Sequence, residues 1–184
     1  MSVEIRGAAF HSFLEAVEAG EGEPAVRAVV ARLPTELRER IERGELTRMG
    51  FFPVSQYELM HEALQATLGG GIARARSLGR RTTEIDLKGI VRFVLGFGTP
   101  ELLVRYADRV FRSYFRGAEI AHREVAPRRH RFRWGEFAEA GPYTRAECVG
   151  SVGYLLDTCG GRGVTVTPVR AARRGDFELE VGWS

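Results

Sequence analysis

Residues 176–183 read Asp176-Phe177-Glu178-Leu179-Glu180-Val181-Gly182-Trp183, a run in which apolar side chains alternate with polar or small ones. A period of two is typical of a strand that buries one face and exposes the other to solvent. We therefore expect the four apolar side chains to face the core and the two glutamates to face solvent. The residues from Val164 to Val169 predict a preceding strand of the same sheet.

Two more strands and a helix precede this run. The stretches Ala118 to Val125 and His130 to Phe137 have strand character, and the turn at Ala126-Pro127 between them predicts a hairpin. Next, Thr144-Arg145-Ala146-Glu147 has the spacing of a capping box and opens a helix that runs to Cys159. The resulting order is β-β-α-β-β, with the last strand paired in one sheet with the strand that carries Arg129 to Arg133.

The first part of the chain predicts helices. A short strand or arm begins at Val3, and helical spacing follows from Phe10 to Gly20, from Pro24 to Leu33, from Thr35 to Arg43, after Ser55, from Ile72 to Leu78 and from Ile85 to Leu95. Thr99-Pro100-Glu101 combines an N-cap, a proline in the first turn and an acid. We expect the helix from Thr99 to Arg116 to be the most buried, with Leu103, Ala107, Val110, Phe111 and Tyr114 inside.

These patterns together predict a single α+β domain over residues 1–184. An N-terminal helical layer of about residues 1–117 is expected to pack on a four-stranded, mainly antiparallel sheet formed by about residues 118–184. The sequence contains no internal repeat and no linker long enough to separate two domains.

Composition narrows the function classes. The chain has 27 basic and 24 acidic residues mixed along its length, so its net charge of +3 does not by itself indicate nucleic-acid binding. Two cysteines are too few for a disulfide framework, and no stretch is long and apolar enough to span a membrane. We expect a cytoplasmic protein. Because Lys88 is the only lysine, the abundance of arginine is typical of a GC-rich bacterial genome.

Three stretches carry a resemblance to known proteins: Leu33-Pro34-Thr35-Glu36-Leu37-Arg38, Phe111-Arg112-Ser113-Tyr114-Phe115-Arg116-Gly117 and the run 176–183. They look like a family of paralogous myxobacterial proteins of unknown function. The helical part followed by β-β-α-β-β also resembles the superfamily of heme-NO-binding domains, four-vinyl-reductase domains and TRAPP small subunits. This wider resemblance implies an apolar cavity or groove, dimerisation through helices, and binding of a small ligand or a protein partner.

Heme and metal binding are not expected. Resemblance to heme-NO-binding domains implies a Tyr-x-Ser-x-Arg motif and a helical histidine, but none of the five tyrosines is followed two residues later by serine. His61 is the only histidine placed firmly inside a helix. Cys148 and Cys159 would lie about 16 Å apart on one helix, too far to share a zinc ion with His122 and His130. We expect no cofactor and two buried free cysteines.

The densest basic cluster comprises Arg128, Arg129, Arg131 and Arg133 around His130. Strand alternation places Arg129, Arg131 and Arg133 on one face, where they could bind phosphates, nucleic acid or an acidic partner. The same arginines could instead pair with Glu178 and Glu180 across the sheet. The sequence leaves both interpretations open.

No catalytic constellation is evident. Ser151 does not lie in a Gly-x-Ser-x-Gly elbow, and Gly150 and Gly153 around it predict close packing onto the sheet or around a ligand. The first hypothesis is a non-enzymatic signalling or scaffold module that binds a hydrophobic ligand or a protein partner. Its candidate ligand-binding residues are Phe93, Phe97, Tyr106, Phe111 and Tyr114, in a cavity between the helical layer and the sheet. The alternatives are nucleic-acid or phosphate binding by the arginine strand, and a heme or metal sensor.

Overall fold

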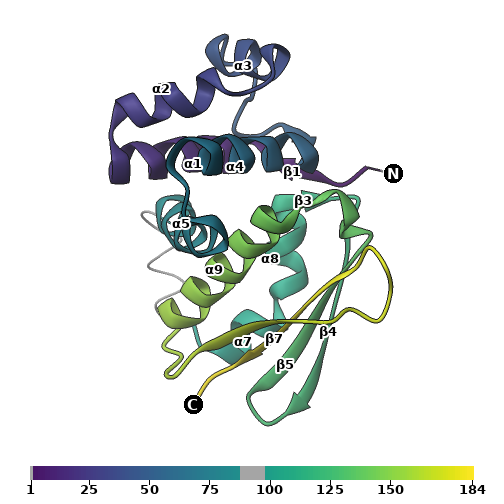
Figure 1. Cartoon of the computed structure of the whole chain (residues 1–184). Helices are drawn as coiled ribbons and strands as arrows, with labels where there is room; N and C mark the ends of the chain where they lie inside the picture. Colours follow the sequence, from purple (N-terminus) through teal and green to yellow (C-terminus); the bar gives the residue numbers. More distant parts are fainter. Residues whose placement is uncertain (1, 88–97) are drawn as a thin grey trace.

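The computed structural model describes residues 2–87 and 98–184 and shows an α+β fold. Residues 2–87 contain the helices α1 (Gly7–Glu21), α2 (Glu23–Ala31), α3 (Thr35–Glu42), α4 (Val54–Leu68) and α5 (Gly71–Asp86). The second half contains α7 (Pro100–Arg105), α8 (Ala107–Tyr114) and α9 (Pro142–Thr158) on one face of a sheet (Figure 1). The predicted fold class is therefore confirmed.

The larger sheet has the strand order β4-β5-β7-β6, with every neighbouring pair antiparallel. Its strands are β4 (Glu119–Ala126), β5 (Arg129–Gly135), β6 (Thr165–Val169) and β7 (Phe177–Gly182), and α9 connects β5 to β6. The predicted pairing of the last strand with the arginine strand is confirmed, since Phe132 lies opposite Leu179 and Trp134 opposite Phe177. All four of these side chains are buried, as expected from the alternation.

The outward face of this sheet is only partly as expected. Glu180 accepts hydrogen bonds from Arg129 and Arg131 across the sheet. Glu178, however, is buried, because the segment before β7 covers it and the Ala172 backbone N–H donates to its carboxylate at 3.2 Å. The strand register is right, but the expectation that Glu178 faces solvent is wrong.

A second, three-stranded sheet was not expected. It has the order β2-β1-β3, in which β1 (Glu4–Arg6) lies between β2 (Phe51–Pro53) and β3 (Phe115–Arg116). The predicted N-terminal strand exists, and its partners are segments too short to show a strand period. The stretch 72–78 is also part of one longer helix, α5, and the predicted helix at 85–95 falls mostly outside the described residues.

The predicted core helix from Thr99 to Arg116 is wrong as a single element. Its start is right, because the Thr99 hydroxyl accepts a hydrogen bond from the Leu102 N–H at 3.3 Å. The helix then breaks at Tyr106 into α7 and α8, and only Pro100, Val104 and Ala107 are buried in the two. Charged residues occupy most sides of α7 and α8, so only a narrow apolar stripe of each helix faces the core. The side chains that are half-buried as a result are Leu103, Val110, Phe111 and Tyr114.

Among the helices of the described residues, α9 has the most buried residues, and it lies between α5 and the larger sheet. Its contact with α5 depends on glycine. A Cβ atom on Gly150 would lie 1.9 Å from the Arg76 carbonyl oxygen, and one on Gly79 would lie 2.1 Å from the Glu147 carbonyl oxygen. Gly150 does permit close packing, but against the backbone of α5 and not against the sheet or a ligand as predicted.

The start of α9 is not closed by the predicted capping box. Instead, the Glu58 carboxylate of α4 accepts hydrogen bonds from the backbone N–H groups of Tyr143 at 3.1 Å and Thr144 at 2.8 Å. A carboxylate at this end also interacts favourably with the helix dipole. This leaves Thr144 and Glu147 free to face the interior. Within residues 2–87 and 98–184, no helix has the length and apolar character of a membrane span.

Candidate functional site

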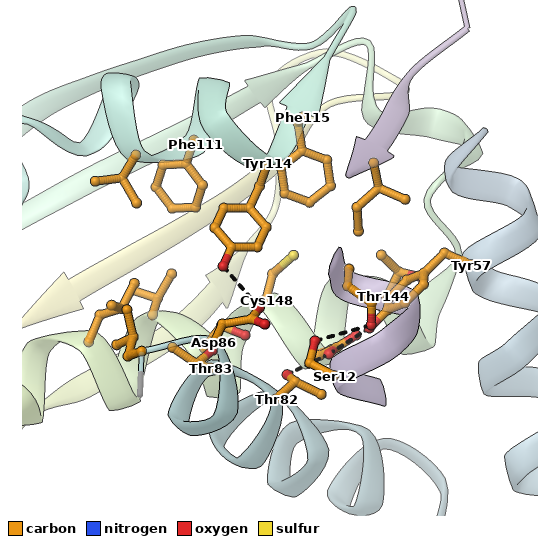
Figure 2. Close-up of a pocket in the computed structure, with 18 residues that line it drawn as sticks. Ser12, Tyr57, Thr82, Thr83, Asp86, Phe111, Tyr114, Phe115, Thr144 and Cys148 are labelled. Carbon is orange, nitrogen blue, oxygen red and sulfur yellow. Dashed lines mark hydrogen bonds between the residues drawn. The ribbon is translucent and has the colours of Figure 1, made fainter. Parts of the chain in front are cut away.

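A cavity of about 110 Å³ lies where α1, α5, α8 and α9 meet (Figure 2). It is not at the helix–sheet interface, where the sequence placed it. There, between α7, α8, α9 and the sheet residues Phe132 and Val181, the structure has a void of only about 20 Å³. The cavity is therefore a feature of helix packing.

One wall of the cavity is apolar. It consists of Ile5, Ala9, Phe111, Phe115, Val152 and Leu155. Phe111 is held from behind by an edge-to-face contact with the fully buried Trp134, at a centroid distance of 5.1 Å. This wall suits a hydrocarbon surface.

The opposite wall is polar and centres on Glu147, which is buried. Its Oε1 atom accepts hydrogen bonds from the Tyr57 and Thr82 hydroxyls, each at 2.9 Å, and its Oε2 atom lies 2.7 Å from His61 Nε2. Burial, with Glu147 beside it, raises the pKa of Tyr57 well above its ordinary value, so this phenol stays protonated. The network joins α4, α5 and α9 around one carboxylate.

A second carboxylate, Asp86, stands at the end of α5 and faces α8. Figure 2 shows the Tyr114 hydroxyl pointing at it, and the two oxygens are 2.9 Å apart. Burial raises the pKa of Asp86, and the hydrogen bond from Tyr114 opposes that shift. Burial also raises the pKa of Tyr114, so the phenol is the donor.

Thr144 stands out on this wall because its hydroxyl oxygen is buried and has no hydrogen-bond partner among the described residues. A buried hydroxyl without a partner carries a desolvation cost of about 1 to 3 kcal/mol. Cys148 also lines the cavity, and burial raises the pKa of its thiol, which is therefore not ionised. The cavity thus offers an unmet hydrogen-bonding group beside an apolar wall.

The predicted ligand-binding residues are only partly brought together. Phe111 and Tyr114 line the cavity, whereas Tyr106 is 50% exposed at the break between α7 and α8. Phe93 and Phe97 lie outside the described residues. Sequence reasoning missed Asp86 and treated Glu147 as a local cap. A signal was available in the apolar surroundings of Glu147, since a carboxylate in so hydrophobic a helix needs partners.

The arginine strand is largely occupied by ion pairs. Arg129 and Arg131 pair with Glu180, and Arg133 pairs with Asp176 at 3.0 Å. Arg128 lies in the β4–β5 turn with a φ of 58°. The pairs with Glu180 follow the cross-strand alternative that the sequence had left open, whereas Glu178, the other predicted partner, accepts a hydrogen bond from the Ala172 N–H instead.

No metal site is formed by the part of the chain that the structure describes, in which no group of three or more His, Cys, Asp or Glu side chains could hold an ion. Cys148 and Cys159 are both free and buried. The rings of His122 and His130 are 6.2 Å apart on the neighbouring strands β4 and β5.

The structure is similar to solved H-NOX proteins over nearly its whole length. The Fe(II) unliganded H-NOX protein from K. algicida matches 98% of this chain and 97% of its own, with a TM-score of 0.73 and 12% identity. An oxygen-binding H-NOX domain related to soluble guanylate cyclases, in its oxygen complex, matches 98% and 95% of the two chains, with a TM-score of 0.68 and 10% identity.

A third H-NOX structure, from work on the function of heme distortion in that family, matches 98% and 95% of the two chains, with a TM-score of 0.69 and 11% identity. No protein-family model matches the sequence, and no curated protein is significantly similar to it. At identities this low the similarity is one of architecture. The chain therefore has the H-NOX fold, including the helix between β5 and β6 and the helical layer above it.

Proposed function

We propose that this chain is a non-enzymatic signalling module that binds one small organic molecule in the cavity between α1, α5, α8 and α9. The observation that carries the proposal is the Thr144 hydroxyl, which is buried at the cavity wall without a partner. A ligand that forms a hydrogen bond with this hydroxyl and packs against the apolar wall would pair the hydroxyl and cover the apolar surface at the same time. The H-NOX fold, whose solved examples include an oxygen complex, supports a binding role.

Heme is the first ligand to weigh, because the similar structures include heme proteins. The residues present do not fit it. A volume of about 110 Å³ is below the roughly 300 to 1,000 Å³ of pockets for drug-sized ligands, and heme is larger than most of those. No histidine or methionine is among the described residues that line the cavity.

The other side chains that bind heme iron are also unsuited. Iron binds the thiolate or phenolate form of Cys and Tyr, but burial raises the pKa of the Cys148 thiol. Tyr57 and Tyr114 both donate their hydroxyl protons to carboxylates. A ligand without iron is therefore the better match to this cavity.

The absence of an enzyme role is supported by the state of the potential nucleophiles. The Ser12 hydroxyl donates to the Ala8 carbonyl at 3.0 Å, and the Ser151 hydroxyl donates to the Gly79 carbonyl at 3.1 Å. Cys148 is held as a neutral thiol by burial, which raises its pKa. Among the described residues, no base is hydrogen-bonded to Ser151 or Cys148, and Ser12, which also interacts with the Asp86 carboxylate, has no histidine or lysine beside it in the cavity lining.

Nucleic-acid binding by the arginine strand is the weaker alternative. Arg129, Arg131 and Arg133 all form ion pairs with Glu180 or Asp176, and releasing them would remove contacts the fold already makes. A cavity ligand requires no such loss. The cavity is therefore the site to test first.

The test measures thermal unfolding of the full chain with ring-sized probes such as toluene and benzylamine. A probe at about 100 times its Kd adds about 2.7 kcal/mol and should raise the Tm by about 5 to 11 °C. Val152→Phe places a ring inside the cavity and should abolish the shift, whereas Val125→Phe, on the exposed part of β4, should keep it.

Two results would refute the proposal. One is that no ring-sized probe shifts the Tm of the unmodified protein. The other is that probes bind Val152→Phe, folded by circular dichroism, as tightly as the unmodified chain. If that variant does not fold, chemical-shift changes at the Thr144 and Val152 methyl groups on adding probe to the unmodified protein decide the matter.

A further inference from the structure

We infer that the cavity ligand is a small amine, a molecule with one ring or a short chain that donates hydrogen bonds and carries a positive charge. This inference rests on the proposed binding function and adds the chemical class. It follows from the hydrogen-bonding capacity of the walls, from their charge and from the cavity volume.

Apart from Thr144, the described hydroxyl groups of the walls have already used their protons. Tyr57 and Thr82 donate to Glu147, and Tyr114 donates to Asp86. Thr83, Ser12 and Ser151 donate to backbone carbonyl groups. Each oxygen still has lone pairs, so what remains for a ligand is mainly the ability to accept hydrogen bonds. Thr144 is the lining hydroxyl that makes no bond to a described residue.

The charge of the walls has one sign. Asp86 and Glu147 both line the cavity, and no arginine, lysine or histidine is among its described lining residues. Glu147 has His61 and two hydroxyl donors, whereas Asp86 has the Tyr114 and Ser12 hydroxyls and no ion pair with any described residue. A cation beside Asp86 would offset the burial of its charge, and a carboxylate or phosphate would meet repulsion there.

The volume limits the size of the ligand. A cavity of about 150 Å³ in another protein binds benzene, and this cavity has about 110 Å³. The volume therefore limits the ligand to about one ring or a short chain. The ligand's ring would lie against Phe111, Phe115 and Val152, with its amino group toward Asp86.

The experiment compares three probes of nearly equal size on the full chain: benzylamine, toluene and benzoate. Their Kd values are measured by isothermal titration calorimetry or by ligand-observed NMR. We expect benzylamine to bind at least about tenfold more tightly than toluene, and benzoate to bind more weakly than toluene. The contrast needs no variant, so it does not depend on whether any substitution folds.

Two variants locate the effect. Asp86→Asn keeps an acceptor for Tyr114 and removes the charge, so it should weaken benzylamine binding about tenfold or more and leave toluene binding unchanged. Asp108→Asn makes the same change on the exposed side of α8 and should alter neither Kd. Thr144→Val should weaken the binding of benzylamine and leave the binding of toluene unchanged.

The outcomes separate the two proposals. Toluene binding as tightly as benzylamine, tighter binding of benzoate, or an unchanged benzylamine Kd in Asp86→Asn would each overturn the amine inference and leave the cavity function standing. Binding of none of the three probes would overturn both. The inference is supported if benzylamine binds most tightly and benzoate most weakly, and if Asp86→Asn weakens benzylamine binding while Asp108→Asn does not.

Discussion

Two glycines three residues apart in α9 should respond oppositely to the same substitution. At Gly150 an added Cβ would lie 1.9 Å from the Arg76 carbonyl oxygen, more than 1 Å closer than real Cβ contacts. Both atoms belong to helix backbones, so α5 and α9 must separate. Overpacking of this kind costs about 1 to 3 kcal/mol, and its upper end applies here. Alanine's helix propensity returns about 1 kcal/mol, leaving a net loss of about 2 kcal/mol for Gly150→Ala.

Gly153 provides the matched control. An added Cβ there would lie 3.4 Å from the end of the Arg80 side chain and 3.8 Å from a Val166 methyl group, which are ordinary contacts. Gly153→Ala should therefore gain about 0.5 to 1 kcal/mol from helix propensity.

Urea denaturation followed by far-ultraviolet circular dichroism measures both free energies of unfolding, and thermal denaturation followed by the same signal measures the Tm. For a chain of this size we expect the Tm to fall by about 4 to 8 °C in Gly150→Ala and to rise by about 1 to 4 °C in Gly153→Ala. Equal stabilities for the two variants, or a stabilised Gly150→Ala, would show that α5 and α9 are not in backbone contact at Gly150.

Three further predictions concern buried or partly buried charges. Glu58→Ala leaves two N–H groups of α9 without an acceptor, so it should lower the free energy of unfolding by about 2 to 4 kcal/mol in urea denaturation. The control Glu62→Ala, at an exposed position of the same helix, should change it by less than about 0.5 kcal/mol. Equal losses in the two variants would contradict the role of Glu58 as the N-terminal cap of α9. Burial raises the folded-state pKa of Asp86 above 3.8, so the contribution of this carboxyl group to stability falls as the pH rises through and above that value. The free energy of unfolding of Asp86→Asn should therefore increase relative to that of the unmodified chain between pH 4 and pH 7. A difference in free energy that does not depend on pH would refute this. Burial lowers the pKa of His130 below 6.5, and the charge of Glu124 partly opposes this shift. An NMR titration should therefore give His130 a pKa below that of a model peptide, and a still lower pKa in Glu124→Gln. A higher pKa in that variant would contradict the interaction between Glu124 and His130.

The sheet could be predicted because its signal is local. The alternation from Phe177 to Trp183 determines which face is buried, and the turn at Pro127 determines which strands form a hairpin. The two short strands that flank β1 could not be predicted, because Phe51–Pro53 and Phe115–Arg116 are too short to show a period.

The candidate site was mostly hidden for a related reason. Glu147 stands three residues after Thr144, and this spacing has a familiar local meaning as a capping box. Its actual partners, Tyr57, His61 and Thr82, come from α4 and α5 and are set by how three helices pack. Only the aromatic residues Phe111 and Tyr114 could be predicted, from the apolar stripe of α8.

The central place of β1 in the small sheet has a consequence for synthesis of the chain. Glu4–Arg6 is translated before either of its partners, and Ile5 pairs with both Phe52 and Phe115. Pairing with β2 requires the chain to have emerged as far as Pro53, whereas pairing with β3 must wait until α8 and Arg116 have emerged. Until then one edge of β1 in the nascent chain has no partner strand, and the pairing of β1 with β3 cannot yet link the N-terminal helices to α8. The small sheet therefore forms late, when the segment ending at Arg116 becomes available.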